Sequence, residues 1–280
     1  MGCCASRATA DGAYEPSSFA KMIAVKQKSD YKAVAFDSLH TAGAKVLVVC
    51  TDDGALKMTN GKVFKSGNAP IELFLPLLHF KAAGFQFEFA TVSGGPVVLE
   101  MWNLPKKDAA VMALYGELEA AMAAPKKLED VDPSLAGYAG IFMPGGHGAM
   151  VNLHESVALG KLLHAAHAAA VPTVSLCHGP AALLAASKVE GAPFPYKEYS
   201  FVSFPDKMDQ TIPKVGYIPG NVPWLVQAAL KEQGMVPLNA AEKGKTHVDR
   251  ELITGDGASA SHRIGVVAAP LLVAAWAKRG

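Results

Sequence analysis

A cysteine and a histidine stand side by side at the end of an apolar run, in "PTVSLCHGPAAL" (residues 172–183). The apolar residues before Cys177 predict a buried strand, and Gly179 and Pro180 predict a tight turn into a helix. A thiol at such a junction lies near a helix N-terminus, whose partial positive charge favours the thiolate. His178 adds an imidazole, and its backbone N–H can face an oxyanion. The pattern indicates a nucleophilic cysteine rather than a cysteine kept for packing.

Two other segments contain residues that suit the same chemistry. "MPGGHG" (residues 143–148) ends another apolar run, and the N–H of Gly146 is a second candidate oxyanion donor. Glu72 stands inside "APIELFLPLL" (residues 69–78), where solvation does not readily explain a carboxylate, although a place near a helix N-terminus would suit its charge. We therefore expect both segments near Cys177.

The order of apolar segments predicts how these residues are positioned. Strands alternate with helices, which implies a mostly parallel sheet with helices on both faces and chemistry outside the carboxyl ends of the strands. A proline-flanked helical segment at about 96–135 interrupts the alternation and is expected to form an inserted cap. Residues 1–42 show no sustained periodicity and are expected to form a flexible arm before an α/β domain at 43–280. The main strands are expected within 44–53, 85–94, 138–143 and 171–177, and the helices within 70–84, 155–170, 180 onward, 223–234 and 264–277.

Composition excludes several classes of protein. Half of the 280 residues are apolar, and 26 Lys and Arg balance 25 Asp and Glu with no basic stripe, which argues against a nucleic-acid binder. Four cysteines form no disulfide framework in a chain of this length, so we expect a reducing compartment. Cys50 closes the first predicted strand and is expected in the core. The longest apolar run, at 264–277, is too short to span a bilayer and contains Pro270.

The first six residues, "MGCCAS", suggest acylation. Gly2 follows the initiator Met and Ser6 occupies the position that N-myristoylation requires, while Cys3 and Cys4 could carry palmitate. Two acyl chains anchor a protein stably where one does so only marginally. We expect a cytoplasmic protein tethered to a membrane surface; a tail without function is the alternative.

Together these motifs resemble the ThiJ/PfpI superfamily, and within it the heat-shock-chaperone branch with glyoxalase III activity. The resemblance runs from about residue 45 to the C-terminus and implies a flavodoxin-like sandwich, usually a homodimer. It also implies that Cys177 is the nucleophile, His178 its adjacent histidine, Asp206 the acidic partner that orients His178, and Glu72 a protonated carboxyl beside the sulfur. The motifs that carry it are "SGNAPIELFLPLLHFKAAGF", "PGGHGAM", "SLCHGPAALLA" and "SFPDKMDQTIPKVGYIPG".

The implied reaction converts methylglyoxal, a small 2-oxoaldehyde, to D-lactate without glutathione or any cofactor. Cys177 would attack the aldehyde, Glu72 or His178 would remove the carbon-bound hydrogen, and water would release lactate from a thioester. The resemblance also allows repair of glycated side chains and binding of unfolded-protein clients.

No metal is expected. Relatives in this branch can carry a two-histidine, one-carboxylate site, but the corresponding positions here are Lys81, Gln86 and Leu118. His164 and His167 share a helix face, yet no third ligand stands at close spacing.

Two other classes of function remain open from the sequence. A chaperone without catalysis would use an exposed apolar surface, for which Trp102, Met112 and Met122 are candidates if they do not pack the cap. A cysteine peptidase or amidotransferase would share the turn at Cys177. The amidotransferase expects a downstream His-x-Glu, and only "HVD" (residues 247–249) is present.

Overall fold

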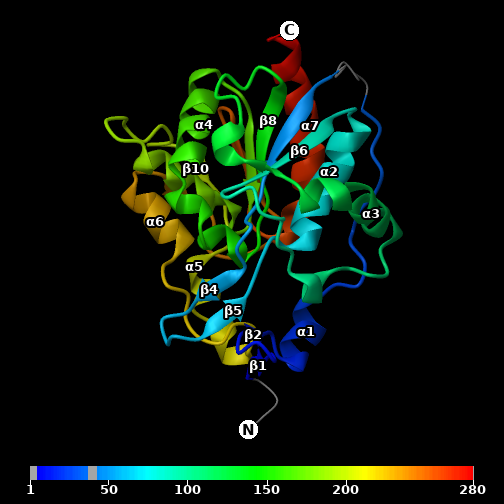
Figure 1. Cartoon of the computed structure of the whole chain (residues 1–280), viewed down its shortest axis with the longest axis vertical. Helices are drawn as coiled ribbons and strands as arrows, with labels where there is room; N and C mark the ends of the chain where they lie inside the picture. Colours follow the sequence, from blue (N-terminus) through cyan, green and yellow to red (C-terminus); the bar gives the residue numbers. More distant parts are fainter. Residues whose placement is uncertain (1–4, 37–42, 280) are drawn as a thin grey trace.

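A seven-stranded sheet forms the centre of the protein, seen in a computed structural model that describes residues 5–36 and 43–279 (Figure 1). The strand order is β12-β13-β9-β8-β3-β6-β7, and every neighbouring pair is parallel except the antiparallel hairpin of β12 and β13. The strands are β3 (Lys45–Val49), β6 (Gln86–Thr91), β7 (Lys126–Lys127), β8 (Tyr138–Met143), β9 (Thr173–Leu176), β12 (Thr246–Asp249) and β13 (Leu252–Gly255).

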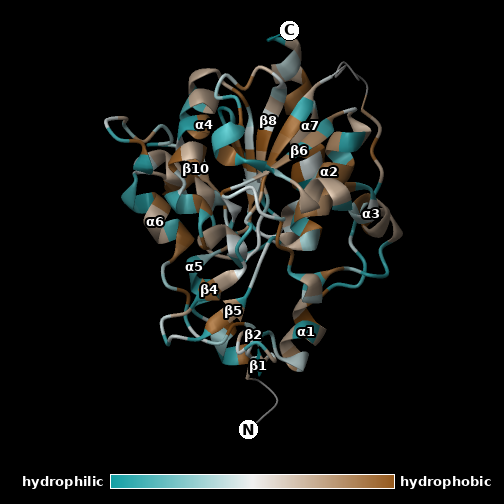
Figure 2. Ribbon diagram, in the orientation of Figure 1, coloured by the Kyte–Doolittle hydropathy of each residue, from teal (hydrophilic) through white to brown (hydrophobic). Residues whose placement is uncertain are grey.

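Helices cover both faces of this sheet (Figure 1). Residues alternate between faces along a strand, so Val46 and Val48 of β3 pack in one core cluster and Leu47 and Val49 in the other. The strands are apolar bands between the two helical layers (Figure 2). One layer holds α2 (Pro70–Ala82), α3 (Ala109–Ala123) and α7 (Ser261–Ala277); the other holds α4 (Val157–Ala168), the 3₁₀ helix η5 (Gly179–Lys188) and α6 (Val226–Glu232).

Shorter elements surround one end of the sheet. A four-stranded sheet has the order β1-β2-β5-β4, and β10 pairs with β11 outside the main sheet. These elements are β1 (Arg7–Ala8), β2 (Tyr14–Glu15), α1 (Ser18–Ala24), β4 (Ala55–Lys57), β5 (Val63–Lys65), β10 (Ser200–Phe201), α5 (Asp206–Asp209) and β11 (Val236–Pro237). Short 3₁₀ helices lie at η1 (Met101–Asn103), η2 (Leu128–Asp130), η3 (His147–Met150), η4 (Leu153–Glu155), η6 (Ile212–Val215) and η7 (Ala258–Ala260).

The expected strands and helices of the main sheet are confirmed, with one difference of type. The segment that begins at Gly179 is a ten-residue 3₁₀ helix, not an α-helix. The C-terminal helix is the only one in the described part of the chain that has the length and apolar composition of a membrane span. Its buried face, which includes Ile264 and Leu272, packs in the same core cluster as α2, so it is a core helix here.

Two expectations about chain organisation are wrong. The segment at about 96–135 continues the strand-helix rhythm rather than forming a separate cap, because β7 extends the main sheet beside β6 and α3 buries Leu114 and Leu118 in the core cluster of α2. The arm carries regular structure in its described part: β2 pairs with β5, and the Ser17 hydroxyl accepts from the Ala20 N–H to cap α1. Its pairing partners lie far away in sequence, so local periodicity could not indicate it.

The close packing of α4 against η5 predicts that Gly160 in α4 cannot be replaced without loss of stability. A Cβ at Gly160 would lie 2.3 Å from the carbonyl oxygen of Ala185, a backbone atom that cannot turn aside. We expect Gly160→Ala to lower the free energy of unfolding by about 1–3 kcal/mol, as measured by urea denaturation. The matched control is Gly116→Ala in α3, where a Cβ meets nothing within 4 Å; there the better helix propensity of alanine should raise stability by about 0.5–1 kcal/mol. Equal effects at both sites would contradict this account.

Candidate active site

Cys177 occupies a strained turn between β9 and η5. Its φ is +57°, a left-handed conformation that costs a residue with a Cβ about 1–2 kcal/mol. Two backbone hydrogen bonds hold it there: its N–H donates to the Gly255 carbonyl at 2.9 Å, and its carbonyl accepts from the Phe204 N–H at 2.9 Å. The side chain faces a cavity and is 5% exposed.

Gly179 is needed at this turn for space rather than for conformation. A Cβ there would lie 2.5 Å from both the Met143 carbonyl oxygen and the Ser175 hydroxyl. The residue with the left-handed backbone is Cys177 itself. The sequence suggested that Gly179 makes the tight turn, and this explanation was wrong.

Cys177, His178 and Asp209 form a buried triad of hydrogen-bonded side chains. The Sγ of Cys177 lies 3.4 Å from Nδ1 of His178, and Nε2 of His178 lies 3.1 and 3.0 Å from the two carboxyl oxygens of Asp209. Burial would raise the pKa of Asp209, but the charge of His178 and hydrogen bonds from both neighbouring histidines outweigh it and hold that pKa well below its ordinary value. An ionised Asp209 favours the proton of His178 on Nε2, which leaves Nδ1 free to accept from the thiol.

The acidic partner of His178 is therefore Asp209, and the expectation for Asp206 is corrected. The Asp206 carboxyl accepts from the Gln227 N–H at 2.8 Å and from the Ala228 N–H at 2.9 Å, so it caps the N-terminus of α6. Both aspartates belong to the four-residue helix α5.

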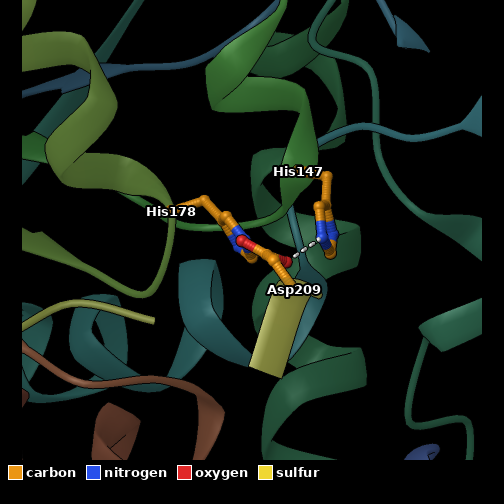
Figure 3. Close-up of side chains that lie close together, drawn as sticks. All are labelled: His147, His178 and Asp209. Carbon is orange, nitrogen blue, oxygen red and sulfur yellow. Dashed lines mark hydrogen bonds and ion pairs between the residues drawn. The ribbon is translucent and has the colours of Figure 1, made fainter. Parts of the chain in front are cut away.

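His147 is a second histidine on the same carboxylate, and sequence reasoning missed it. Its Nε2 lies 3.1 Å from Oδ1 of Asp209, and its ring stacks on that of His178 with centroids 3.9 Å apart (Figure 3). Phe204 packs on His178 at a centroid distance of 4.7 Å. His178 is thus fixed by two rings and by Asp209. The signal in the sequence was the position of His147 directly after Gly145–Gly146.

Glu72 lies beside the sulfur, where the absence of a side chain at Gly145 leaves room for it. A Cβ at position 145 would lie 1.9 Å from Oε2 of Glu72 and 2.6 Å from Cβ of Cys177. The Cys177 side chain and the Gly146 N–H interact with the Glu72 carboxyl, and its Oε2 has no hydrogen-bond partner among the described residues. The Gly146 N–H also interacts with Cys177, as required of an oxyanion donor.

Burial governs protonation of this pair. It raises the pKa of Glu72 well above its ordinary value, which favours the protonated carboxyl, and in that form the group can donate to the sulfur. Burial, together with the neighbouring Glu72, also raises the pKa of the Cys177 thiol. The helix end alone therefore does not produce the thiolate that the sequence suggested; a proton acceptor such as His178 is needed. Cys50, fully buried, lies in the core as expected.

A cavity of about 430 Å³ opens onto Cys177, Glu72 and both histidines. Residues of the arm, including Ile23 and Ser29, form part of its wall. Glu100 is a further buried carboxyl on the wall that sequence reasoning missed; its Oε1 accepts from the Ser66 hydroxyl at 3.2 Å. Burial raises the pKa of Glu100 to about 7, although the charge of His147 and hydrogen bonds from Ser66 and Asn103 oppose the rise.

Three side chains of this site could also hold a metal ion. His147, His178 and Asp209 offer ligand atoms within 4.8 Å of one another, and all three are buried. The same atoms hydrogen-bond to each other, which is the arrangement that a proton-transfer triad needs.

The positions considered for a metal from the sequence have other roles. Lys81 pairs with Glu117 and Leu118 packs in the core. His164 contacts the Ala186 carbonyl and His167 contacts Glu251, so these two histidines do not share a ligand. The predicted acylation sites Gly2, Cys3 and Cys4 lie outside the described residues.

Comparison with known proteins gives consistent results for sequence and fold. The sequence model of the DJ-1/PfpI family matches residues 63–194. The chain is 39% identical over 273 residues to the protein/nucleic acid deglycase HchA of Pseudomonas aeruginosa strain LESB58, covering 95% of this chain and 94% of that protein. It is 40% identical over 270 residues to protein/nucleic acid deglycase 1 of Escherichia coli strain K12, with the same coverage.

Solved structures share the fold at lower sequence identity. Glyoxalase III from Candida albicans superposes with a TM-score of 0.66 at 19% identity, over 81% of this chain and 97% of that one. The 24 kDa rapid encystment protein of Francisella tularensis superposes with a TM-score of 0.70 at 18% identity, over 82% and 99% of the two chains.

The buried Glu100 makes stability depend on pH in a predictable direction. The unfolded chain loses this proton near the ordinary pKa of 4.5, whereas the folded protein holds it up to about 7. Between these values the folded state binds more protons, so Glu100 lowers stability as the pH rises. We expect the gain in unfolding free energy from Glu100→Gln to be larger at pH 8 than at pH 5 by about 2 kcal/mol, measured by urea denaturation. Glu119→Gln, on the exposed side of α3, serves as the control. A gain that does not vary with pH would show that Glu100 titrates normally.

Proposed function

Because this chain belongs to the DJ-1/PfpI family, we propose that it is a cofactor-independent glyoxalase III-type enzyme that converts methylglyoxal to D-lactate through a covalent bond to Cys177. The observation that carries the proposal is the Glu72 carboxyl packed against the sulfur, opposite a complete Cys177–His178–Asp209 triad. The named activities of the deglycase relatives and of the Candida albicans glyoxalase support the same chemistry.

The first step forms a carbon–sulfur bond. Nδ1 of His178, 3.4 Å from Sγ, accepts the thiol proton as sulfur attacks the aldehyde carbon. The resulting alkoxide takes the proton of the Glu72 carboxyl and becomes a hemithioacetal, which leaves Glu72 as a carboxylate. The N–H groups of Gly146 and His178 are donors to the oxygen. Asp209 holds the imidazolium that forms.

The second step moves a proton between neighbouring carbons. A base removes the hydrogen on the sulfur-bearing carbon, the enediol forms, and a proton added to the next carbon gives a thioester. Glu72, a carboxylate after the first step, is the base for this transfer, because its Oε2 is unpartnered and it faces the cavity beside the sulfur. His178 has its other nitrogen committed to Asp209. Water then cleaves the thioester to lactate and restores the thiol.

A cysteine peptidase is the competing enzyme class, since a Cys-His-Asp triad alone would serve it. Glu72 argues against that class. A Cys-His-Asp triad does not need a further carboxyl beside the nucleophile, whereas the proton transfer between carbons that a 2-oxoaldehyde requires needs a group that gives and takes a proton there.

Acylation at Gly2, Cys3 and Cys4 and a homodimeric state belong to the proposal as well. Acylation rests on the "MGCCAS" motif alone. We expect intact-mass spectrometry of the native protein to show myristoyl and palmitoyl mass on the N-terminal peptide. An unmodified peptide would remove the membrane tether from the proposal and leave the catalytic site unaffected.

The main test is lactate formation from methylglyoxal without glutathione. We expect Cys177→Ser to lose at least about 10³-fold in kcat, because a serine hydroxyl at this site lacks the acidity and nucleophilicity of the thiol. Retained activity would remove the covalent mechanism. If suppression of client aggregation survives in this variant, chaperone function is separate from the catalytic site.

Two aspartates provide a matched pair for the same assay. Asp209→Asn removes the charge that orients His178 and should reduce kcat by about 10²–10⁴-fold. Asp206→Asn weakens only the cap of α6 and should lower stability by about 1 kcal/mol while kcat stays within about twofold. The opposite ranking would restore Asp206 as the triad member.

A further inference from the structure

The two most exposed large apolar side chains of the described residues are neighbours on α1. Met22 is 73% exposed and Ile23 is 59% exposed, and Phe19, one turn earlier, is 38% exposed. Positions 19, 22 and 23 follow the spacing i, i+3 and i+4, so their side chains share one side of the helix. These three residues form an apolar stripe that faces solvent, where a surface helix ordinarily carries polar residues.

The other sides of α1 are fixed to the protein. Ala20 is fully buried, and the N–H of Ser17 donates to the Gly216 carbonyl at 2.9 Å. Lys21 forms an ion pair with Glu15 of β2 at 2.7 Å. Because these contacts determine which side of α1 faces the protein, a rotation of the helix cannot bury the apolar stripe.

Four exposed lysines lie on the segments that adjoin α1. Lys26 and Lys28 follow the helix directly along the chain. Lys106 and Lys107 belong to a distant segment, which is held beside the arm because the N–H of Lys107 donates to the Gln27 carbonyl at 3.2 Å. Two separate parts of the chain thus bring positive charge to the region of the apolar stripe.

Carboxylates in the same region are fewer, and most of them are occupied. Glu15 is neutralised by Lys21, and Asp108 is buried and accepts from the N–H of Ser29 at 2.8 Å. Asp30 is exposed. One free carboxylate therefore stands against the four lysines, and the region attracts an anionic surface.

The start of the chain lies close to α1. Arg7 of β1 is opposite Glu15 of β2 in the register of the two strands, and Glu15 contacts Lys21 of α1. Figure 1 shows β1, β2 and α1 at the same end of the molecule. Gly2 precedes Arg7 by five residues, a span of at most about 18 Å in an extended chain. An acyl chain on Gly2 would therefore reach the same surface that α1 contacts.

We propose that the apolar stripe of α1 and the four lysines beside it form a docking surface for a membrane that contains anionic lipids. The apolar side chains enter the boundary between headgroups and acyl chains, and the lysines contact the lipid phosphates. A second copy of this chain fits the surface less well, since it would bring the same positive charges together.

The inference deepens the membrane tether of the proposed function, on which it rests. Acyl chains on a flexible segment hold a protein near a bilayer but do not orient it. The docking surface supplies the orientation. Ile23 of the apolar stripe also lines the catalytic cavity, as do Ala24 and Lys26. Docking therefore places the wall of the cavity that α1 forms next to the lipid.

Vesicle sedimentation with the full-length chain, produced without acyl groups, tests this surface by itself. We expect binding to vesicles of equal parts phosphatidylserine and phosphatidylcholine that weakens as salt rises, and binding about tenfold weaker to phosphatidylcholine alone. Lys26→Gln combined with Lys28→Gln should reduce this preference. Equal binding to both kinds of vesicle would overturn the role of the lysines and with it the proposal.

A matched pair of double variants tests the apolar stripe in the same assay. Met22→Gln combined with Ile23→Gln should weaken binding about tenfold, because glutamine preserves helix propensity and removes the apolar contact. The control, Val157→Gln combined with Leu271→Gln, removes two exposed apolar side chains from α4 and α7. It should leave binding within about twofold, since neither residue lies near α1 in the fold. Equal losses in the two variants would contradict the proposal.

Hydrogen exchange of the unsubstituted chain gives a second measurement that needs no variant. The amides of α1 should exchange about tenfold more slowly on phosphatidylserine vesicles than in solution, while those of α6 stay unchanged. Unprotected α1 amides would overturn the proposal. So would loss of self-association, or of client binding, in Met22→Gln combined with Ile23→Gln while vesicle binding persists. An unmodified N-terminal peptide in the native protein would instead remove only the acyl tether of the proposed function, because these measurements use the unacylated chain.

Discussion

The close approach of the Glu72 carboxyl to the Cys177 sulfur is the constraint on which the site depends. It requires that position 145 carry no side chain, since a Cβ there would overlap the carboxyl oxygen. It also requires Cys177 to adopt a left-handed backbone, which the hydrogen bonds of its N–H and carbonyl to neighbouring segments maintain. The sheet stabilises this strained turn, because the parallel strands β8 and β9 place the glycine loop and Cys177 at the same edge.

Burial of Glu72 and Cys177 controls their protonation, and it makes a separate proton acceptor necessary in the site. It raises the pKa of both groups, so neither is ionised easily, and a separate acceptor must take the thiol proton. The chain places that acceptor at the next residue, His178, and fixes its ring between His147 and Phe204 with Asp209 on its far nitrogen. Glu72 is then available to give a proton to the substrate and to take one from it.

The arm and the segment before α3 enclose the cavity together. Asp108 connects them: its Oδ1 accepts from the Val111 N–H to cap α3, and its Oδ2 accepts from the N–H of Ser29 at 2.8 Å. One carboxylate thus caps the N-terminus of α3 and holds the arm that forms part of the cavity wall. Since the wall comes from segments distant in sequence, the charge at the mouth is a property of their assembly rather than of any motif.

Interactions between near neighbours in the chain account for the local features of this protein. Apolar runs of strand length, prolines at helix starts and the junction at Cys177–His178 follow from interactions among near neighbours, and those predictions agree with β3, β8, β9 and α2. Glu72 could be singled out because an ionisable side chain in an apolar helix is unusual whatever surrounds it.

The packing of distant segments selects which acidic residue contacts His178. Asp206 and Asp209 lie three residues apart on one short helix, and packing of α5 against α6 turns the first toward the N-terminus of α6 and the second toward His178. The positions of His147 and Glu100, and the folded part of the arm, depend likewise on contacts between segments separated by tens to hundreds of residues. Such contacts form when apolar faces pack together, and the order of residues in any one segment does not record them.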